Sequence, residues 1–500
     1  MKKKIKQFYV TTPIYYPNNN LHIGHAYTTV LADIINRYKK NDNYETYFLT
    51  GSDEHGEKIY LSAKKENKSP KEFVDKIIIN FKNLWSLLGI EYDHFIRTTD
   101  ETHINFVQES FNKLLEEKKI YKGKYSGLYC VYDEEFFTKT QAKNNKCPNC
   151  NRELIYLEED TYFLKISEYK DWIKNKLETN DFLKPKSRRN ELLKNFIPEL
   201  KDLSITRENI HWGINLKNDE KQTIYVWFDA LNNYLSTFKY KNSKWKIDDI
   251  WNKKSNVEIL QIIGKEITRF HAIYWPIILK MYGYKLPQIL SHGWIVDLDG
   301  KKMSKSMNNF IQPEKLIKKY GRDAIRFFLI NNISIGEDGK FSEELLKKNI
   351  NGILVNKYSN LINRMLSILF KKTNGIIFKS EKFKKEENEF DNLKDEFKEK
   401  LNSYSFFESS KLIINFTDKL NIFIDKNEIW NLKNKDLEEH LYFIFKEIWN
   451  LSILFSPILI DSSKKILEMF QEENHNFDNW NKNLDNKKII KIDFLFKKID

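Results

Sequence analysis

Near its N-terminus the chain reads Ile5-Lys-Gln-Phe-Tyr-Val-Thr-Thr12, then Pro13-Ile-Tyr-Tyr-Pro17 and, after four more residues, His22-Ile-Gly-His25. The first run is β-rich and alternates, so it predicts a strand that ends at the prolines. Apolar side chains recur at helical spacing over residues 22–39 and predict a helix with one apolar face. A second strand is predicted over residues 45–50, with helical sequence after it. This order predicts an α/β fold with a doubly wound parallel sheet of the nucleotide-binding kind.

The strand pattern is interrupted between residues 116 and 222 by a segment that holds all three cysteines, which predicts an insertion. Strand-like sequence returns at residues 223–228, 257–263 and 288–296 and is expected to complete the sheet. Ser342 is expected to cap a helix, because Glu343 and Glu344 follow it and favour a first turn. The predicted division is 1–115 and 223–300 for the two halves of the sheet domain, 116–222 for the insertion, 301–345 for a lysine-rich loop and connecting region, and 346–500 for an all-α bundle.

Composition sets the broad class of protein. Five hundred residues leave room for about three domains, and a hydrophobic fraction of 41% excludes a wholly disordered chain. The net charge of +13 suits a polyanion such as RNA, although AT-biased codon usage explains a lysine-rich chain equally well. Three cysteines cannot form a disulfide framework, so a reducing, cytoplasmic setting is expected. The sequence has no apolar run of about 18 residues and no signal-peptide core, so no membrane association is expected.

Two short sequence motifs indicate the chemistry of the protein. The two commonest phosphate-binding loops, G-x-x-x-x-G-K-[ST] and G-x-G-x-x-G, are absent. His22-Ile-Gly-His25 instead begins a helix directly after a strand, where unpaired backbone N–H groups and the helix dipole favour an anion. Far downstream, Lys302-Met-Ser-Lys-Ser306 offers two ammonium groups that suit the charge developing on a pyrophosphate leaving group. Either motif alone is weak evidence for phosphate binding, since a lysine cluster is usually a solvated surface.

The two motifs occur in this order, and the predicted sheet between them is interrupted by the insertion. In this arrangement they resemble the HIGH and KMSKS motifs of the class I aminoacyl-tRNA synthetases. The resemblance covers essentially the whole chain. It implies a Rossmann-like catalytic domain, a connective insertion over 116–222, a KMSKS loop with a stem-contact region over 301–345, and a helical anticodon-binding domain over 346–500.

Within that class the chain resembles the methionyl enzymes. Its insertion is short and bears cysteines, whereas isoleucyl, valyl and leucyl enzymes carry a much larger editing domain; cysteinyl enzymes stay possible on size. The strings Thr12-Pro-Ile-Tyr-Tyr-Pro-Asn18, Tyr225-Val-Trp-Phe-Asp-Ala230 and Gly264-Lys-Glu-Ile-Thr-Arg-Phe-His271 carry the resemblance. It implies that the substrate ammonium is bound by Asp53 and that the methionine pocket is lined by Ile14, Tyr16, Trp227, Ala230, Leu231, Tyr234, Ile267 and His271.

An aromatic wall suits a thioether, because sulfur–aromatic contacts contribute about 0.3 to 1.5 kcal/mol each. His271 or a tyrosine hydroxyl is expected to donate weakly to the sulfur. The alternative for these aromatic residues is an ordinary apolar core.

The implied reaction has two steps. The carboxylate of L-methionine attacks the α-phosphate of ATP, which is bound with Mg²⁺, to give methionyl-adenylate and pyrophosphate. The methionyl group then passes to the 3′ end of tRNA(Met), initiator and elongator. The expected catalytic residues are His22, His25, Lys302 and Lys305, and the expected ATP-binding residues are Gly24, Gly264, Glu266 and Lys305. Two alternatives are a catalytically retired tRNA-binding protein on the same scaffold and a ligase for another amino acid.

The insertion holds Cys130-Val-Tyr-Asp133 and Cys147-Pro-Asn-Cys150, which resemble the zinc knuckle of the family. The motif is incomplete because Asp133 stands where a second cysteine is expected. A carboxylate oxygen can bind zinc, so the resemblance implies a Zn²⁺ site formed by Cys130, Asp133, Cys147 and Cys150. The alternative is a degenerate knuckle that folds without metal.

In the helical region, Asn356, Asn360 and Arg364 are spaced four residues apart and are expected on one helix face. Such a stripe is usually solvated surface, but it resembles the anticodon-reading helix of methionyl enzymes. Trp430 matches a tryptophan on which an anticodon base stacks; the alternative is a core tryptophan. The sequence ends where the family's core ends, without an appended tRNA-binding module, so a monomer is expected.

Overall fold

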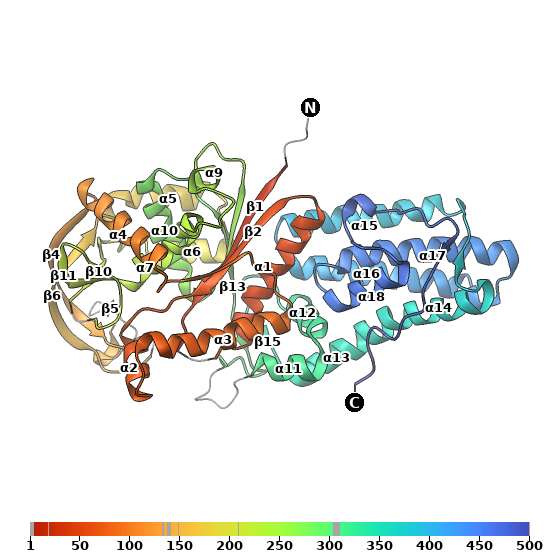
Figure 1. Cartoon of the computed structure of the whole chain (residues 1–500), viewed down its shortest axis with the longest axis horizontal. Coiled ribbons are helices and arrows are strands. Elements are labelled where there is room, and N and C mark those ends of the chain that lie inside the picture. Colours follow the sequence, from red (N-terminus) through yellow and green to blue (C-terminus); the bar gives the residue numbers. More distant parts are fainter. Residues whose placement is uncertain are drawn as a thin grey trace.

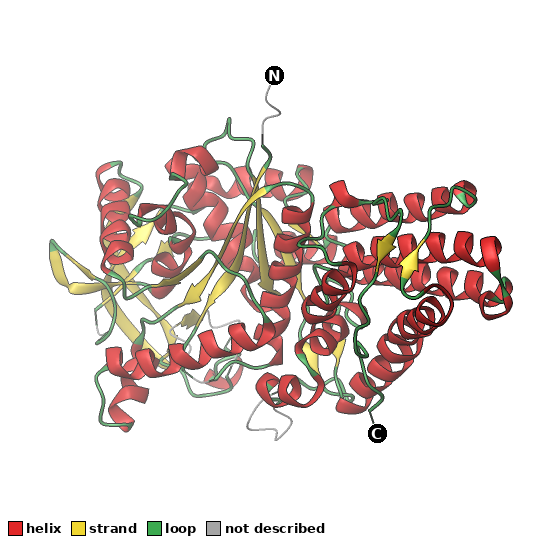
Figure 2. Cartoon of the chain, turned by 45° about the vertical axis from the view of Figure 1, so that its right-hand side comes forward, coloured by secondary structure: helices red, strands yellow, loops and turns green. Residues whose placement is uncertain are grey.

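The computed structural model describes residues 5–18, 20–132, 135–137, 142–148, 150–208, 210–303 and 311–499. The molecule is elongated, with an α/β part and a helical part lying end to end (Figure 1). Colouring by secondary structure shows strands concentrated in the first part and helices almost alone in the second (Figure 2).

The α/β part is built on a six-stranded sheet of order β3-β2-β1-β12-β13-β7, in which every pairing is parallel. The strands are β3 (His94–Arg97), β2 (Glu45–Ser52), β1 (Gln7–Tyr15), β12 (Glu258–Gly264), β13 (Gln288–His292) and β7 (Leu183–Lys184). The chain runs from β1 to β2 and β3 on one side and adds β12 and β13 on the other. The strand order therefore reverses between β1 and β12, where doubly wound sheets bind their ligands. The predicted fold class is confirmed.

Both faces of this sheet are buried. In β1, Phe8 and Val10 belong to one apolar core, and Tyr9 between them belongs to the other, as strand alternation requires. The first core also contains buried residues of α1 (Ile23–Asn41) and α3 (Pro70–Leu88), and the second contains those of α4 (Glu101–Glu116) and α10 (Trp275–Tyr282). The first core continues without a break into the helical bundle.

The segment 116–222 forms two small antiparallel sheets, but it is not one separate body. One sheet has the order β5-β4-β6-β8 and the other β10-β11-β9. Their strands are β4 (Ile120–Cys130), β5 (Glu135–Phe137), β6 (Ile155–Leu164), β8 (Leu203–Ser204), β9 (Thr206–Arg207), β10 (Asn215–Leu216) and β11 (Asp219–Ile224). Between α5 (Lys170–Thr179) and α6 (Lys186–Asn195), however, the chain returns to the central sheet as β7.

The strand predicted over residues 223–228 does not complete the central sheet, because β11 pairs with β9 and β10 in a separate antiparallel sheet. Its second half is not a strand. β11 ends at Ile224, and α7 (Val226–Leu231) begins two residues later, followed by α8 (Asn233–Ser236). Phe228 and its neighbours up to Leu231 are buried, and a short apolar run of this kind fits a buried helix as well as a strand. The strands predicted over 257–263 and 288–296 correspond to β12 and to β13 with β14 (Ile295–Val296).

The helical part begins as predicted at Ser342, whose Oγ accepts a hydrogen bond from the backbone N–H of Leu345 at 3.1 Å. Its elements are α13 (Glu343–Asn349), a π-helix (Ile350–Ser359), α14 (Asn360–Thr373), α15 (Lys384–Asn402), α16 (Phe406–Lys426), α17 (Asn434–Phe455) and α18 (Ile460–Phe470). Two helices, α11 (Pro313–Tyr320) and α12 (Arg322–Asn331), precede it. Within the described ranges, none of the helices has the length and apolar character needed to cross a bilayer.

Candidate active site

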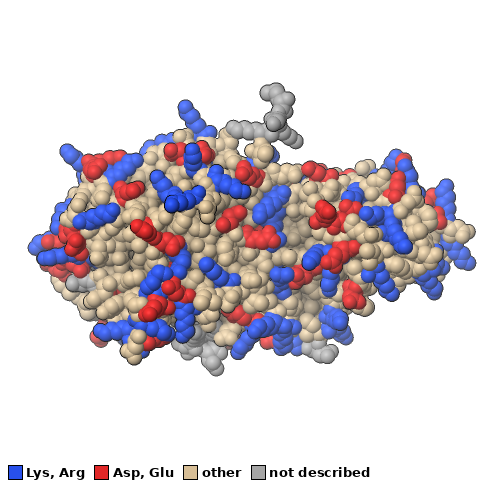
Figure 3. All heavy atoms as spheres, viewed as in Figure 1, with Lys and Arg blue, Asp and Glu red and all other residues tan. Residues whose placement is uncertain are grey.

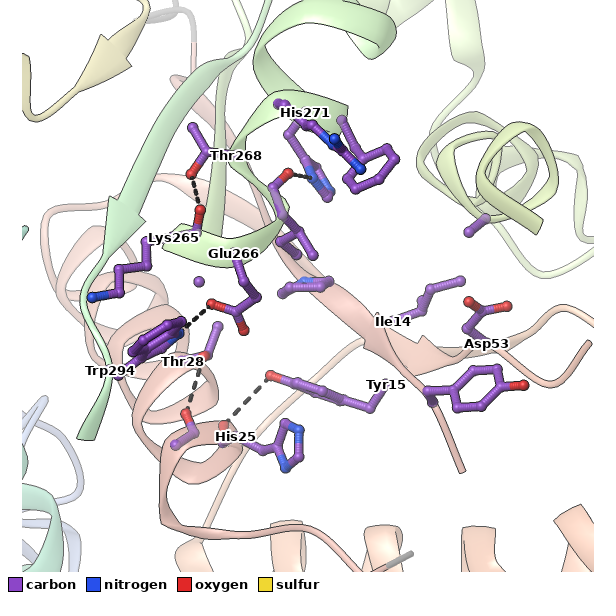
Figure 4. Close-up of a pocket in the computed structure, with 18 of the residues that line it drawn as sticks. Ile14, Tyr15, His25, Thr28, Asp53, Lys265, Glu266, Thr268, His271 and Trp294 are labelled. Atoms are coloured by element: carbon purple, nitrogen blue, oxygen red, sulfur yellow. Dashed lines mark hydrogen bonds between the residues drawn. The ribbon is translucent and has the colours of Figure 1, made fainter. Parts of the chain in front are cut away.

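A pocket of about 770 Å³ opens at the carboxyl ends of the central strands (Figure 4). The residues that line this pocket come from positions up to nearly 300 apart in the sequence. Every described residue that was predicted to act in catalysis, ATP binding or methionine binding lines it. These are Ile14, Tyr16, His22, Gly24, His25, Asp53, Trp227, Ala230, Leu231, Tyr234, Gly264, Glu266, Ile267, His271 and Lys302. Lys305 lies outside the described residues.

The two histidines of the His22-Ile-Gly-His25 motif cap helix α1. Nδ1 of His22 accepts a hydrogen bond from the backbone N–H of Gly24 at 3.0 Å, and Nδ1 of His25 accepts one from the backbone N–H of His22 at 3.1 Å. The two rings stack with their centroids 3.8 Å apart. Since each Nδ1 is an acceptor, the proton of each neutral ring is on Nε2, which is left as a donor.

Both rings are neutral at physiological pH. Burial and, to a smaller extent, the nearby ammonium of Lys302 together lower the pKa of His22 to about 4, while Glu266 acts in the opposite direction. Burial, His22 and Lys302 likewise hold the pKa of His25 well below its ordinary value. The helix N-terminus therefore presents two uncharged imidazole N–H groups, and the nearby Lys302 supplies a positive charge.

Glycine leaves room for a neighbouring side chain at two points of the pocket wall. A Cβ on Gly24 would lie 2.9 Å from Cε1 of His22, and one on Gly264 would lie 2.7 Å from Oε2 of Glu266. Any side chain at these positions would displace a ring or a carboxylate that faces the pocket.

The other half of the pocket is aromatic. The rings of Trp227 and Phe270 stack with centroids 3.7 Å apart. The hydroxyl of Tyr234 donates to Nε2 of His271 at 2.8 Å, and Nδ1–H of His271 donates to the carbonyl of Ile267 at 3.1 Å. Burial lowers the pKa of His271 to about 4, so the ring is neutral.

These contacts correct one expectation. The protons of His271 and of the Tyr234 hydroxyl are both engaged by protein atoms, so neither group donates to a substrate sulfur in this arrangement. The aromatic surfaces remain as the feature that suits a thioether.

In the insertion, three predicted zinc ligands lie together. The Sγ atoms of Cys130, Cys147 and Cys150 are all within 4.8 Å of one another, and those of Cys130 and Cys150 are 3.5 Å apart. Tetrahedral zinc with bonds of about 2.3 Å to sulfur requires sulfur–sulfur distances of about 3.8 Å, so the three thiols fit this ion. Asp133 lies outside the described residues.

In the helical part, Asn356, Asn360 and Arg364 line one groove of about 600 Å³, together with residues of α16. Nη1 of Arg364 pairs with Oδ1 of Asp425 at 2.8 Å. Trp430 does not line this groove but follows at the end of α16, and it is 45% exposed, so it is no core tryptophan.

Figure 3 shows Lys and Arg scattered over both parts of the visible face among Asp and Glu, so the net charge forms no single patch there.

Comparisons with known proteins agree with this geometry. The family described as "tRNA synthetases class I (M)" matches residues 8–156 and 152–366. A methionine–tRNA ligase of Mycoplasmopsis pulmonis is 41% identical over 514 residues, covering 100% of both chains. One from Clostridium perfringens is 39% identical over 510 residues, covering 99% of this chain and 78% of the relative. The chain belongs to the methionyl-tRNA synthetases.

Solved structures of the family agree. Methionyl-tRNA synthetase of Mycobacterium tuberculosis, solved in complex with methionyl-adenylate, matches with a TM-score of 0.91 at 30% identity, covering 98% of this chain and 100% of that one. The apo form of the same enzyme matches with a TM-score of 0.86 at 27% identity. The predicted family and the predicted enzyme class, an aminoacyl-tRNA ligase for methionine, are therefore confirmed.

Sequence reasoning missed a buried network behind the methionine half of this synthetase. Asp229 lies in α7 and is 1% exposed. Its Oδ2 accepts from Nδ1–H of His55 and its Oδ1 from Nε2–H of His103, both at 2.7 Å. Burial acts to raise the pKa of Asp229, but the two histidines hold it below its ordinary value. The network ties the loop that carries Asp53 to the helix that carries Trp227, and only its spatial arrangement reveals it.

We predict that the rings of His22 and His25 remain neutral Nε2–H tautomers from pH 8 down to about pH 6. In ¹⁵N-histidine NMR spectra the midpoint of His22 should lie near 4, in keeping with its lowered pKa. The unfolded chain binds this proton below about pH 6.5 and the folded chain does not, so this residue makes stability fall as pH drops from about 6.5 toward 4. His22→Asn, which keeps a capping side chain, assigns the signal. A midpoint above 6 for either ring would contradict the prediction.

Proposed function

We propose that this synthetase activates L-methionine with Mg²⁺-bound ATP, forming methionyl-adenylate and pyrophosphate, and then transfers the methionyl group to the 3′ end of initiator and elongator tRNA(Met). One observation supports the assignment of residues to ATP and methionine binding. The capped N-terminus of α1, the Lys302 ammonium and the aromatic surface around Trp227 all face a single pocket. ATP and methionine bound there are side by side.

We assign the triphosphate to the N-terminus of α1. The side chains of His22 and His25 already accept the first backbone N–H groups of the helix, so the helix dipole and the Nε2–H groups of the two rings are what favour a phosphate there. Lys302 lines the same pocket near the two histidines, and Gly264 and Glu266 are assigned to the ribose. Because the leaving pyrophosphate gains negative charge as the α-phosphate is attacked, donors and an ammonium that are already in place lower the barrier. Lys305 is assigned to the same task from the sequence motif alone.

We assign the methionine side chain to the opposite half of the pocket. Asp53 takes the substrate ammonium, and the remaining predicted residues, among them Trp227 and Tyr234, surround the thioether. The carboxylate of methionine then faces the α-phosphate without help from a protein base. Catalysis rests on positioning and on charge stabilisation.

The test of this assignment is methionine-dependent ATP–pyrophosphate exchange, assayed with all twenty amino acids. Exchange should require methionine, and Lys302→Ala and Lys305→Ala should each lower kcat about 100-fold or more, the scale expected for loss of a charge-stabilising group. Lys301→Ala is the matched control, because its ammonium lies 3.9 Å from Asp299 and its side chain is 59% exposed. Exchange with a different amino acid would refute the substrate, and tRNA binding without exchange would favour the retired binder.

We further propose that Cys130, Cys147 and Cys150 hold Zn²⁺, with Asp133 as the fourth ligand. The three neighbouring thiols support this assignment. Cys130 and Cys147 are 1% exposed, which suits a structural ion that shields its ligands from solvent. The ion would fold the knuckle and take no part in the reaction.

After a wash with chelator, the protein should retain about one equivalent of zinc by elemental analysis. Cys147→Ser should lose the metal and lower the melting temperature, because binding and folding of such a knuckle are coupled. Asp133→Ala should weaken zinc retention more than substitution of the exposed Lys146, which bears no ligand atom of this kind. Less than half an equivalent in the wild type would support the metal-free alternative.

We assign anticodon recognition to Asn356, Asn360, Arg364 and Trp430. The first three share a groove in which their side chains can reach base edges. Trp430 has an exposed ring on which a base can stack, at roughly 1 to 3 kcal/mol per base.

Trp430→Ala should leave pyrophosphate exchange unchanged and lower kcat/KM for tRNA charging about tenfold or more, because the stacking surface is lost. Ile422→Ala is the control, since Ile422 lies on α16 and is 64% exposed. Equal loss in both assays would show that Trp430 serves folding instead.

A further inference from the structure

Trp294 was not among the predicted site residues, yet it lines the ATP half of the pocket. It follows the end of β13 and points its indole toward Glu266, with Lys265 beside it (Figure 4). Its Nε1–H donates to Oε2 of Glu266 at 2.9 Å. The ammonium of Lys302 lies 4.6 Å from the centroid of its ring. One side chain thus contacts a residue assigned to the ribose and a residue assigned to the pyrophosphate.

The backbone of Trp294 is held by residues 337–339. The backbone N–H of Trp294 donates to Oδ1 of Asp338 at 2.8 Å, and its carbonyl accepts from the N–H of Gly339 at 2.8 Å. Asp338 also pairs with Lys265 at 2.7 Å, which neutralises the second ammonium near the ring. A Cβ on Gly293 would lie 2.1 Å from the carbonyl of Glu337, so the chain packs tightly at this point. These contacts fix Trp294 without any help from a substrate.

Lys302 is tied to the same piece of chain. Val296, two residues after Trp294, forms an antiparallel bridge with Lys302. Oδ1 of Asp297 accepts from the N–H of Lys301 at 2.8 Å and closes the turn between them. The backbone of Lys302 and that of Trp294 are therefore held in register, and an ammonium over an indole face is a favourable arrangement.

We propose that Trp294 is a positioning residue of the activation step. Its N–H holds the carboxylate of Glu266 against the ribose, and its ring holds the ammonium of Lys302 until the pyrophosphate charge develops. The two ends of ATP are thus aligned by one side chain that does not contact the reacting atoms. This inference rests on the proposed function of Glu266 and Lys302.

Two variants separate the two contacts. Trp294→Phe keeps a ring face and removes the N–H, so it should raise KM for ATP about tenfold, the scale of a hydrogen bond to a charged group, and leave kcat within about threefold. Trp294→Leu removes both contacts and should in addition lower kcat about two- to thirtyfold, the range of a cation–π contact. Both variants should leave KM for methionine unchanged, because the methionine half lies on the other side of the pocket. The readout is pyrophosphate exchange at varied ATP and varied methionine.

The matched control is Trp172→Leu, which removes a tryptophan whose ring lies 5.7 Å from the Lys280 ammonium and outside the active-site pocket. It should change neither KM nor kcat. The inference is overturned if both Trp294 variants match the wild type, or if KM rises equally for ATP and methionine, which would indicate general distortion. If Trp294→Leu fails to fold, the inference is tested by Trp294→Phe alone, in which KM should rise for ATP and not for methionine. A wild type without methionine-dependent exchange would instead refute the proposed function itself.

Discussion

The arrangement of the whole molecule depends on one buried ion pair in the middle of helix α1. Asp33 and Arg326 are both 0% exposed, and Oδ2 of Asp33 accepts from Nη2 of Arg326 at 2.7 Å. Burial acts to raise the pKa of Asp33, but Arg326 and Arg37 together hold it below its ordinary value. A buried pair of this kind is tolerated only where its remaining hydrogen-bonding groups are satisfied. Here Arg326 also donates to the carbonyls of Pro457 and Ile458, each at 2.8 Å.

Those carbonyls lie at the corner between α17 and α18, so the ion pair joins the sheet domain to the end of the bundle that contacts it. The C-terminal end of α1 adds a second joint, where Nζ of Lys39 donates to Oδ1 of Asn402 at 3.3 Å and Lys398 pairs with Asp42 at 2.6 Å. The helix that carries His22 at its start is thus fixed to the bundle at its middle and its end. These contacts link the position of the pocket to that of the groove that Asn356, Asn360 and Arg364 line.

The sequence predicts those parts of the site that local chemistry or a family motif specifies. His22 was expected at a helix start because glycine and polar residues follow a strand there, and the structure shows it as the capping residue. The strand expected over 223–228 failed because a short apolar run carries no period of its own. Trp294 was missed for a related reason. It lay inside a predicted strand over 288–296, and the break at Gly293 comes from contact with Glu337, which is distant in sequence. The Asp229 network depends on pairings over more than 100 positions in the same way.

The electrostatics of the pocket explain why histidines, and not more lysines, begin α1. Two cations with rings 3.8 Å apart would repel each other, and burial would add a desolvation cost to each. Neutral imidazoles avoid both costs and keep an N–H group that is able to donate a hydrogen bond to an anion. A positive charge near the two rings comes from Lys302, whose ammonium lies 4.6 Å from the centroid of the Trp294 ring. An aromatic face attracts an ammonium far more weakly than a buried anion does, so this contact only weakly opposes a shift of the ammonium toward an anion in the pocket.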